Sequence, residues 1–151
     1  MRGRGLVLLV ALGLLADSAV SQHLIWQSDL QVRALTVSES KGTLVAKVIL
    51  VTELGEASGA RVEVMLPVGV GLLEVGPGCT AGPSPPGVPS LRARVVCTAG
   101  SLRPRETREF FVTTTTPPPG LERRFGVMAM SDTPDPKPGN NFAERVIPRP
   151  H

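Results

Sequence analysis

The segment from residue 131 to residue 141 limits the possible fold of this sequence more than any other stretch. It contains three prolines, at positions 134, 136 and 138. Each proline fixes φ and removes a backbone donor, so neither a helix nor a central β-strand can run through the segment. Gly139 adds backbone freedom, and the Asp and Asn side chains near it can bond their own backbone in Asx-turns. We therefore predict a shaped connection between two strands.

The rest of the sequence consists of short apolar runs separated by turn residues. Its 16 glycines and 15 prolines are too many for a helical bundle. Loops are expected over 53–59 and 76–90, and a turn over 99–105. Strands are expected over residues 30–37 (with a bulge), 43–52, 61–66, 70–75, 91–97, 106–115, 124–130 and 142–147. Seven to eight short strands with turns between them predict an all-β, immunoglobulin-like antiparallel β-sandwich.

Alternation along these strands predicts which side chains form the core. Aromatic residues make up only 3% of the sequence, so we expect a core of Val, Leu and Ala. The strand over 91–97 is expected to turn Leu91, Ala93, Val95 and Cys97 inward. The larger core residues are expected to be Phe110, Phe125 and Phe142.

The first 21 residues have the pattern of an export signal. Arg2 and Arg4 precede an apolar run over 6–16, and small residues follow at 19–21. The run has 11 residues, whereas a bilayer-spanning helix needs about 20. We expect cleavage before Gln22; the alternative is an uncleaved anchor or a cytosolic N-terminal helix.

The predicted organisation is a signal peptide (1–21), a leader (22–28), one β-sandwich (29–147) and a tail (148–151). Cleavage lowers the formal charge from +3 to +2, because two Arg and one Asp are removed. A charge this close to neutral does not favour nucleic-acid binding. We expect no transmembrane segment after cleavage, and a protein that is periplasmic, attached to the cell surface or secreted.

Cys79 and Cys97 are the two cysteines of the sequence. An exported protein meets an oxidising compartment, where paired cysteines form disulfides. The alternation over 91–97 places Cys97 on the core face, from which it can reach back to Cys79. A metal site would need more ligands than two thiols and the histidines near the termini provide. We predict a disulfide.

A series of short motifs occurs in a fixed order along the sequence. The motifs are Asp29-Leu30, residues 66–70, Gly78-Cys79, Val96-Cys97, residues 100–102, and residues 131–136 with Asn140-Asn141. In these motifs the sequence resembles the bacterial conserved-repeat immunoglobulin-like domain, known as domain of unknown function eleven. The resemblance implies an immunoglobulin-like module of bacterial envelope and surface proteins, usually without catalysis.

The sequence offers little for catalysis, and we predict no catalytic residue. His23 and His151 lie outside the predicted core, so neither is held beside a nucleophile. The serines lack a strand–turn–helix elbow. Glu106 and Glu109 are flanked by arginines, as expected of a solvated ion-pair face.

Calcium is the one cofactor that the sequence raises. Asp132, Asp135, Asn140 and Asn141 supply hard oxygen ligands within one loop. Their spacing is not that of an EF-hand, and the prolines restrict how they converge. The competing interpretation is that these side chains bond loop backbone groups and end the strands.

Six arginines form a second candidate site. If their strands are neighbours, these side chains form a basic patch suited to anionic glycans or lipid headgroups. Otherwise Arg is simply the preferred surface cation, interleaved with Glu. Nucleic acid fits less well, because no aromatic residues accompany the charge. The six are Arg92, Arg94, Arg105, Arg108, Arg123 and Arg124.

These observations predict an exported, non-catalytic structural or protein-interaction module of the bacterial envelope or cell surface. Its partner is expected to be another envelope or surface protein, recognised through loops and exposed strand faces. One alternative is a ligand-binding module for calcium or an anionic glycan. The second alternative is an enzyme.

Overall fold

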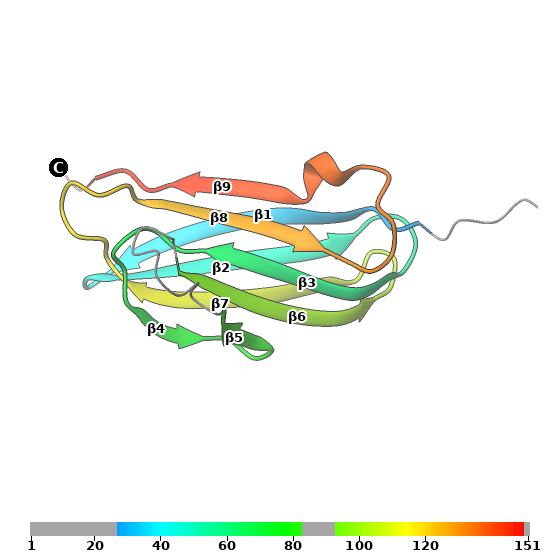
Figure 1. Cartoon of the computed structure of the whole chain (residues 1–151), viewed down its shortest axis with the longest axis horizontal. Coiled ribbons are helices and arrows are strands. Elements are labelled where there is room, and N and C mark those ends of the chain that lie inside the picture. The colour runs from blue at the N-terminus through cyan, green and yellow to red at the C-terminus, as the bar shows by residue number, and fades with distance from the viewer. Residues whose placement is uncertain (1–26, 83–92, 150–151) are drawn as a thin grey trace, which may run out of the picture.

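The structure is a computed structural model that describes residues 27–82 and 93–149. The predicted signal peptide, both histidines, Leu91 and Arg92 lie outside these ranges. In the described residues the backbone forms nine strands and one 3₁₀ turn (Figure 1). None of the helical structure in these ranges has the length and apolarity needed to span a bilayer. The elements are β1 (Leu30–Ser40), β2 (Thr43–Thr52), β3 (Ala57–Met65), β4 (Leu72–Val75), β5 (Cys79–Ala81), β6 (Arg94–Leu102), β7 (Thr107–Thr115), β8 (Arg124–Met130), η1 (Pro138–Asn140) and β9 (Phe142–Val146).

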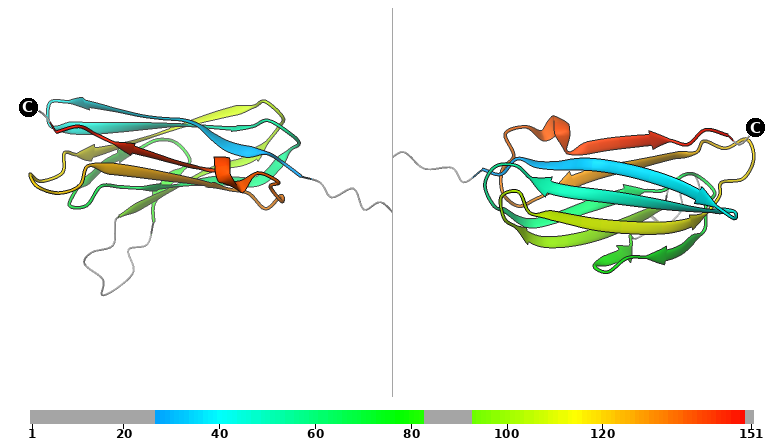
Figure 2. Two further views of the ribbon diagram at one scale, coloured as in Figure 1. Left: turned by 90° about the horizontal axis from the view of Figure 1, so that it is seen from above. Right: turned by 180° about the vertical axis from the view of Figure 1, so that it is seen from behind.

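The strands form two antiparallel sheets, ordered β1-β2-β7-β4 and β5-β6-β3-β8-β9, which pack as two layers (Figure 2). An immunoglobulin domain has the orders A-B-E-D and C-F-G. Both orders are reproduced when β1, β2, β3, β4, β7, β8 and β9 take the letters A to G. The hairpin of β5 and β6 is an addition beside β3. The predicted all-β, immunoglobulin-like sandwich is confirmed, with β5 as one strand more than predicted.

The space between the sheets is filled mainly by Val, Leu and Ala, as predicted. Phe125 is fully buried and Phe110 is 5% exposed. The prediction for Phe142 is wrong, because this side chain is 44% exposed. It lies on the edge strand β9 opposite Met128, which is 43% exposed. Both side chains therefore belong to the outer face of their sheet.

Strand β3 begins earlier than predicted, inside the expected loop 53–59. Its pairing with β6 shifts register between Ala57 and Ala60 and again before Arg61. Gly59 lies in this irregular part with a φ of +58°, a value that glycine adopts without strain. The bulge therefore lets a strand continue through residues whose glycine and polar character predicted a loop.

Three further predictions about the neighbouring hairpin are wrong. β6 runs on to Leu102, where a turn was expected over 99–105, because Leu102 pairs with Ala57 of β3. β5 lies within the expected loop 76–90. Ala93 is exposed rather than inward, since it precedes the first residue of β6. Val95 and Cys97 are buried as predicted.

The disulfide between Cys79 and Cys97 is confirmed, with an S–S distance of 2.01 Å. The two residues are directly opposite each other in the β5–β6 ladder. Cys97 is fully buried and Cys79 is 8% exposed. The bridge therefore links the two strands of the added hairpin to each other, with Cys97 in the core.

Candidate functional site

The three-proline connection between β8 and β9 meets the start of β1 at one end of the sandwich (Figure 1). Asp29, the residue before β1, is 4% exposed. Its carboxylate accepts hydrogen bonds from Asn140 Nδ2 at 2.7 Å and from Lys137 Nζ at 2.9 Å. A buried carboxylate needs such partners, and both come from residues more than 100 positions further along the sequence. These contacts attach the beginning of the first strand to the connection.

Asp135, which belongs to the connection, also attaches it to the start of β1. Its Oδ2 accepts hydrogen bonds from the backbone N–H of Leu30 at 3.1 Å and from Asn141 Nδ2 at 3.0 Å. Its Oδ1 accepts the backbone N–H of Lys137 at 2.7 Å. Both carboxylate oxygens are thus engaged with protein donors.

The structure brings three of the four predicted calcium ligands together, but as members of a hydrogen-bonded network. Asp135, Asn140 and Asn141 belong to it, whereas Asp132 lies apart, 3.3 Å from Arg61 Nη1. The described residues contain no group of three or more His, Cys, Asp or Glu that could hold a metal ion. The contacts agree with the interpretation that these side chains bond the loop itself. Calcium binding stays a prediction.

The network predicts how acid acts on the fold. Hydrogen bonds from Asn140 and Lys137 hold the pKa of the Asp29 carboxyl below its ordinary value, although burial opposes them. A lowered pKa in the folded state means that the contribution to stability is present above the ordinary value of 3.8 and is lost as pH falls below it. The unfolding free energy that Asp29→Asn removes should therefore shrink as the pH falls from 7 to 3 in urea titrations.

The control for this titration is Asp132→Asn. The Asp132 side chain is 69% exposed and contacts Arg61 at the surface, so its loss should change stability little at any pH. A difference between wild type and Asp29→Asn that is constant from pH 7 to pH 3 would contradict the role assigned to the buried carboxylate.

The described arginines of the predicted anion site do not form one patch. Arg94 lies on β6, Arg108 on β7 and Arg124 on β8, and no two of these strands are neighbours in a sheet. Arg105 and Arg108 line one hollow together with Glu56 and Glu106. The pairs with glutamate are Arg94–Glu63 (3.5 Å), Arg108–Glu106 (2.9 Å), Arg123–Glu39, and Arg124 with Glu122 (2.7 Å) and Glu144 (2.9 Å). This arrangement favours interleaved surface pairs; anion binding by these residues stays a prediction.

A different concave site is lined by the end of β1 and by the β7–β8 connection. These segments lie at the opposite end of the sandwich from the three-proline connection (Figure 1). Two neighbouring cavities of about 390 and 270 Å³ lie there, and both are lined by Leu121, Arg123 and Arg149. We call their union the end groove. One lobe is walled by the prolines at 117–119, and the other by Val146, Ile147 and Pro148.

Three segments that are distant in sequence build the end groove. The end of β1 supplies Glu39, the β7–β8 connection supplies residues 116–123, and the segment after β9 supplies Arg149. The proline run ends β7, because proline cannot continue a paired strand. Its rings then form a wall that loses little conformational entropy when a ligand covers it.

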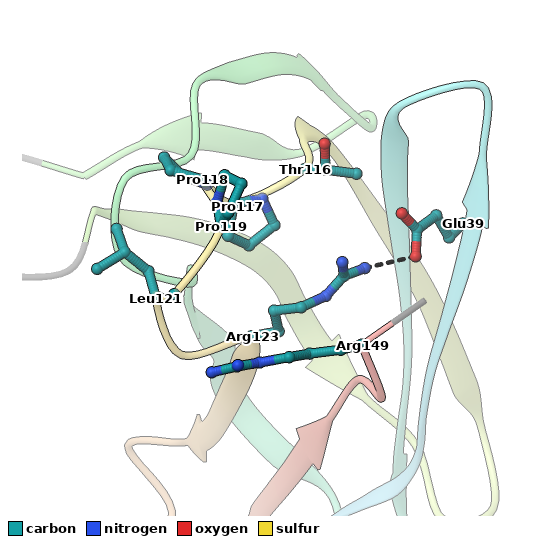
Figure 3. A pocket seen from close by; sticks show the side chains of 9 residues that line it. Glu39, Thr116, Pro117, Pro118, Pro119, Leu121, Arg123 and Arg149 are labelled. Atoms are coloured by element: carbon teal, nitrogen blue, oxygen red, sulfur yellow. Dashed lines mark hydrogen bonds and ion pairs between the residues drawn. The ribbon is translucent and has the colours of Figure 1, made fainter. Parts of the chain in front are cut away.

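The two arginines of the end groove differ in their partners (Figure 3). Arg123 forms an ion pair with Glu39, and its side chain is only 10% exposed. Arg149 is exposed and forms no ion pair with any described residue. In Figure 3 its guanidinium points away from Glu39, along the side of the groove where Leu121 lies. The groove therefore contains one neutralised cation and one that is accessible.

Sequence reasoning named Arg123 but missed Glu39 and Arg149. The available signal was the proline run at 117–119 followed closely by charged residues, a combination that often marks a shaped loop. No pattern in the sequence connects that loop with residue 39 or residue 149. The groove exists only because the fold brings the three segments together.

Compared with protein-family models and with curated proteins, the sequence gives no match. Solved structures show a weak likeness. The chitin-binding domain of a chitinase from Pyrococcus furiosus is 13% identical, and the alignment spans 72% of this protein and 96% of that domain with a TM-score of 0.44. An uncharacterized protein from Nocardia farcinica with an immunoglobulin-like fold is 14% identical, with coverage of 78% and 87% and a TM-score of 0.46. Likeness at this level does not extend to what the protein binds.

Proposed function

We propose that this protein is a non-catalytic binding domain of the bacterial envelope or cell surface, which holds a segment of a partner protein in its end groove. The observation that carries the proposal is a two-lobed groove with apolar walls and one accessible guanidinium, that of Arg149. Binding sites commonly combine apolar walls with a few placed polar groups.

The size and lining of the end groove suit binding better than chemistry. Its lobes measure about 390 and 270 Å³, which is room for a few side chains in each. The titratable groups that line the larger lobe are Glu39, Arg123 and Arg149. Glu39 is engaged by Arg123, so it is not poised as a general base. An extended peptide with apolar side chains in both lobes matches this lining.

The envelope location rests on two features outside the groove. The predicted signal peptide directs export, and the Cys79–Cys97 bridge is suited to an oxidising compartment. The resemblance to the bacterial conserved-repeat family points the same way. A partner protein in the same compartment is therefore the natural occupant.

Site-specific photo-cross-linking tests this function. A photoreactive amino acid replaces Leu121 in the groove, and in a second variant it replaces Phe142 on the outer sheet face. The two side chains have similar exposure, 38% and 44%, so apolar exposure alone predicts equal capture. We expect one defined envelope protein to be linked through position 121 in the native cells, and not through position 142.

The result also identifies the surface that binds the partner protein. Capture through position 142 alone would assign binding to the outer sheet face and contradict a role for the groove. Capture through neither position would contradict the proposed function. A captured protein supports the proposal only if its purified form binds the wild-type domain and competes with labelling at position 121.

A further inference from the structure

The charges in the end groove identify the chemistry of its occupant. The Arg123–Glu39 pair is internally neutral, because the Glu39 carboxylate is engaged by a guanidinium whose side chain is largely buried. Glu122, which lines the smaller lobe, is paired with Arg124. Arg149 adds a positive charge that no described residue neutralises through an ion pair. A planar guanidinium is matched by a carboxylate, with which it can form two parallel hydrogen bonds.

We propose that the end groove binds a peptide carboxylate flanked by apolar side chains, with Arg149 as the group that contacts the carboxylate. This inference rests on the proposed function, because it names the ligand class of the same groove. Arg149 lines both lobes, so a carboxylate bound to it leaves neighbouring side chains free to enter the lobes on either side. Arg123 serves as a positioning residue, since its guanidinium is engaged by Glu39.

The same observations disfavour ligands of other chemistry. A phosphate dianion would bring two negative charges to a groove with one accessible cation, so one of its charges would stay unmatched. An anionic sugar ring usually lies against an aromatic side chain, and the described residues that line either lobe include none. Proline, leucine, valine and isoleucine walls instead suit aliphatic side chains.

The carboxylate has two sources, the C-terminal end of a peptide or an Asp or Glu side chain. Three short probes separate them: N-acetyl-Leu-Val with a free C-terminal acid, N-acetyl-Leu-Glu-Val amide, and N-acetyl-Leu-Gln-Val amide as the neutral control. Binding of each probe to the full mature protein is followed by NMR chemical-shift titration. We expect at least one acidic probe to bind about tenfold more tightly than the neutral one, with its shifts at residues of the end groove.

Two matched variants assign the effect to Arg149. Arg149→Gln should weaken binding of the acidic probe by about tenfold and leave the neutral probe unchanged. Arg145→Gln removes the same charge from exposed strand β9, outside the lining of the groove. It should lower affinity only slightly, and that small change should vanish at high salt.

The outcomes distinguish this inference from the function on which it rests. Equal binding of acidic and neutral probes, no binding of either acidic probe, or an Arg149→Gln variant that binds the acid normally would each overturn the carboxylate assignment. If cross-linking through position 121 still captures a partner in that case, the groove remains a binding site with a different chemistry. If both experiments fail, the proposed function falls together with the inference.

Discussion

A Phe125→Ala variant is expected to lose about 3–5 kcal/mol of unfolding free energy, the range for removing a buried phenylalanine. Phe125 is fully buried and is the largest such side chain in the core. It lies on β8 on the core face of its sheet, and most of the residues around it are aliphatic. Their fixed backbones cannot collapse into the space that the ring leaves. The loss is a large share of the stability of a domain this size.

Phe142→Ala is the matched control for this variant, since it makes the same chemical change. Phe142 is 44% exposed on β9, so its removal should change stability by about 0.5 kcal/mol or less. Urea unfolding followed by far-UV circular dichroism measures both variants. Similar losses for the two variants would show that the face assignment of β8 and β9 is incorrect.

The contrast between these phenylalanines shows what a sequence pattern can predict. Phe125 starts an alternation with Val127 and Ala129 on a strand that has neighbours on both sides, and all three side chains are buried. Phe142 lies on the outer face of the same sheet, opposite Met128, and is 44% exposed although it is part of a strand. Alternation tells which residues share a face of a strand. It does not tell whether another layer covers that face.

The missed strand segments have a related cause, since pairing with a distant partner overrides local composition. β5 is a three-residue strand in a stretch rich in glycine and proline, and it exists through its ladder with β6. The last residues of β6 include Gly100, which predicts a turn locally but pairs with Ala60 of β3. Propensity describes the isolated segment, whereas a partner strand supplies hydrogen bonds that the segment lacks.

The candidate sites were predictable to different degrees for the same reason. The three-proline connection was visible because its turn chemistry lies in one continuous stretch. Its anchoring role was not, because Asp29 and Asn140 are 111 positions apart. The end groove was less visible still, since Glu39, the proline run and Arg149 share no local pattern. The arginines are the reverse case. They are near one another in sequence, which suggested a single patch, but the sheet order separates their strands.

Replacing both cysteines, Cys79→Ala with Cys97→Ala, is expected to lower the unfolding free energy by about 3 kcal/mol. The bridge closes a separation of 18 residues, and removing it increases the conformational entropy of the unfolded state. Alanine is used because both sites are nearly or fully buried, where a serine hydroxyl would lack partners. The melting temperature should fall by on the order of 10 °C.

Reduction of the wild-type protein separates two contributions to its stability, that of the covalent cross-link and that of the packing of the two sulfur atoms. Reduced wild type keeps both side chains in place and loses only the covalent closure. If reduction and double substitution cost similar amounts, the stabilisation comes from the cross-link. If reduction costs much less, most of the loss in the variant comes from the space that the sulfur atoms leave among the buried core residues. A double variant as stable as oxidised wild type would show that β5 and β6 need no bridge, contrary to the expectation for a three-residue strand.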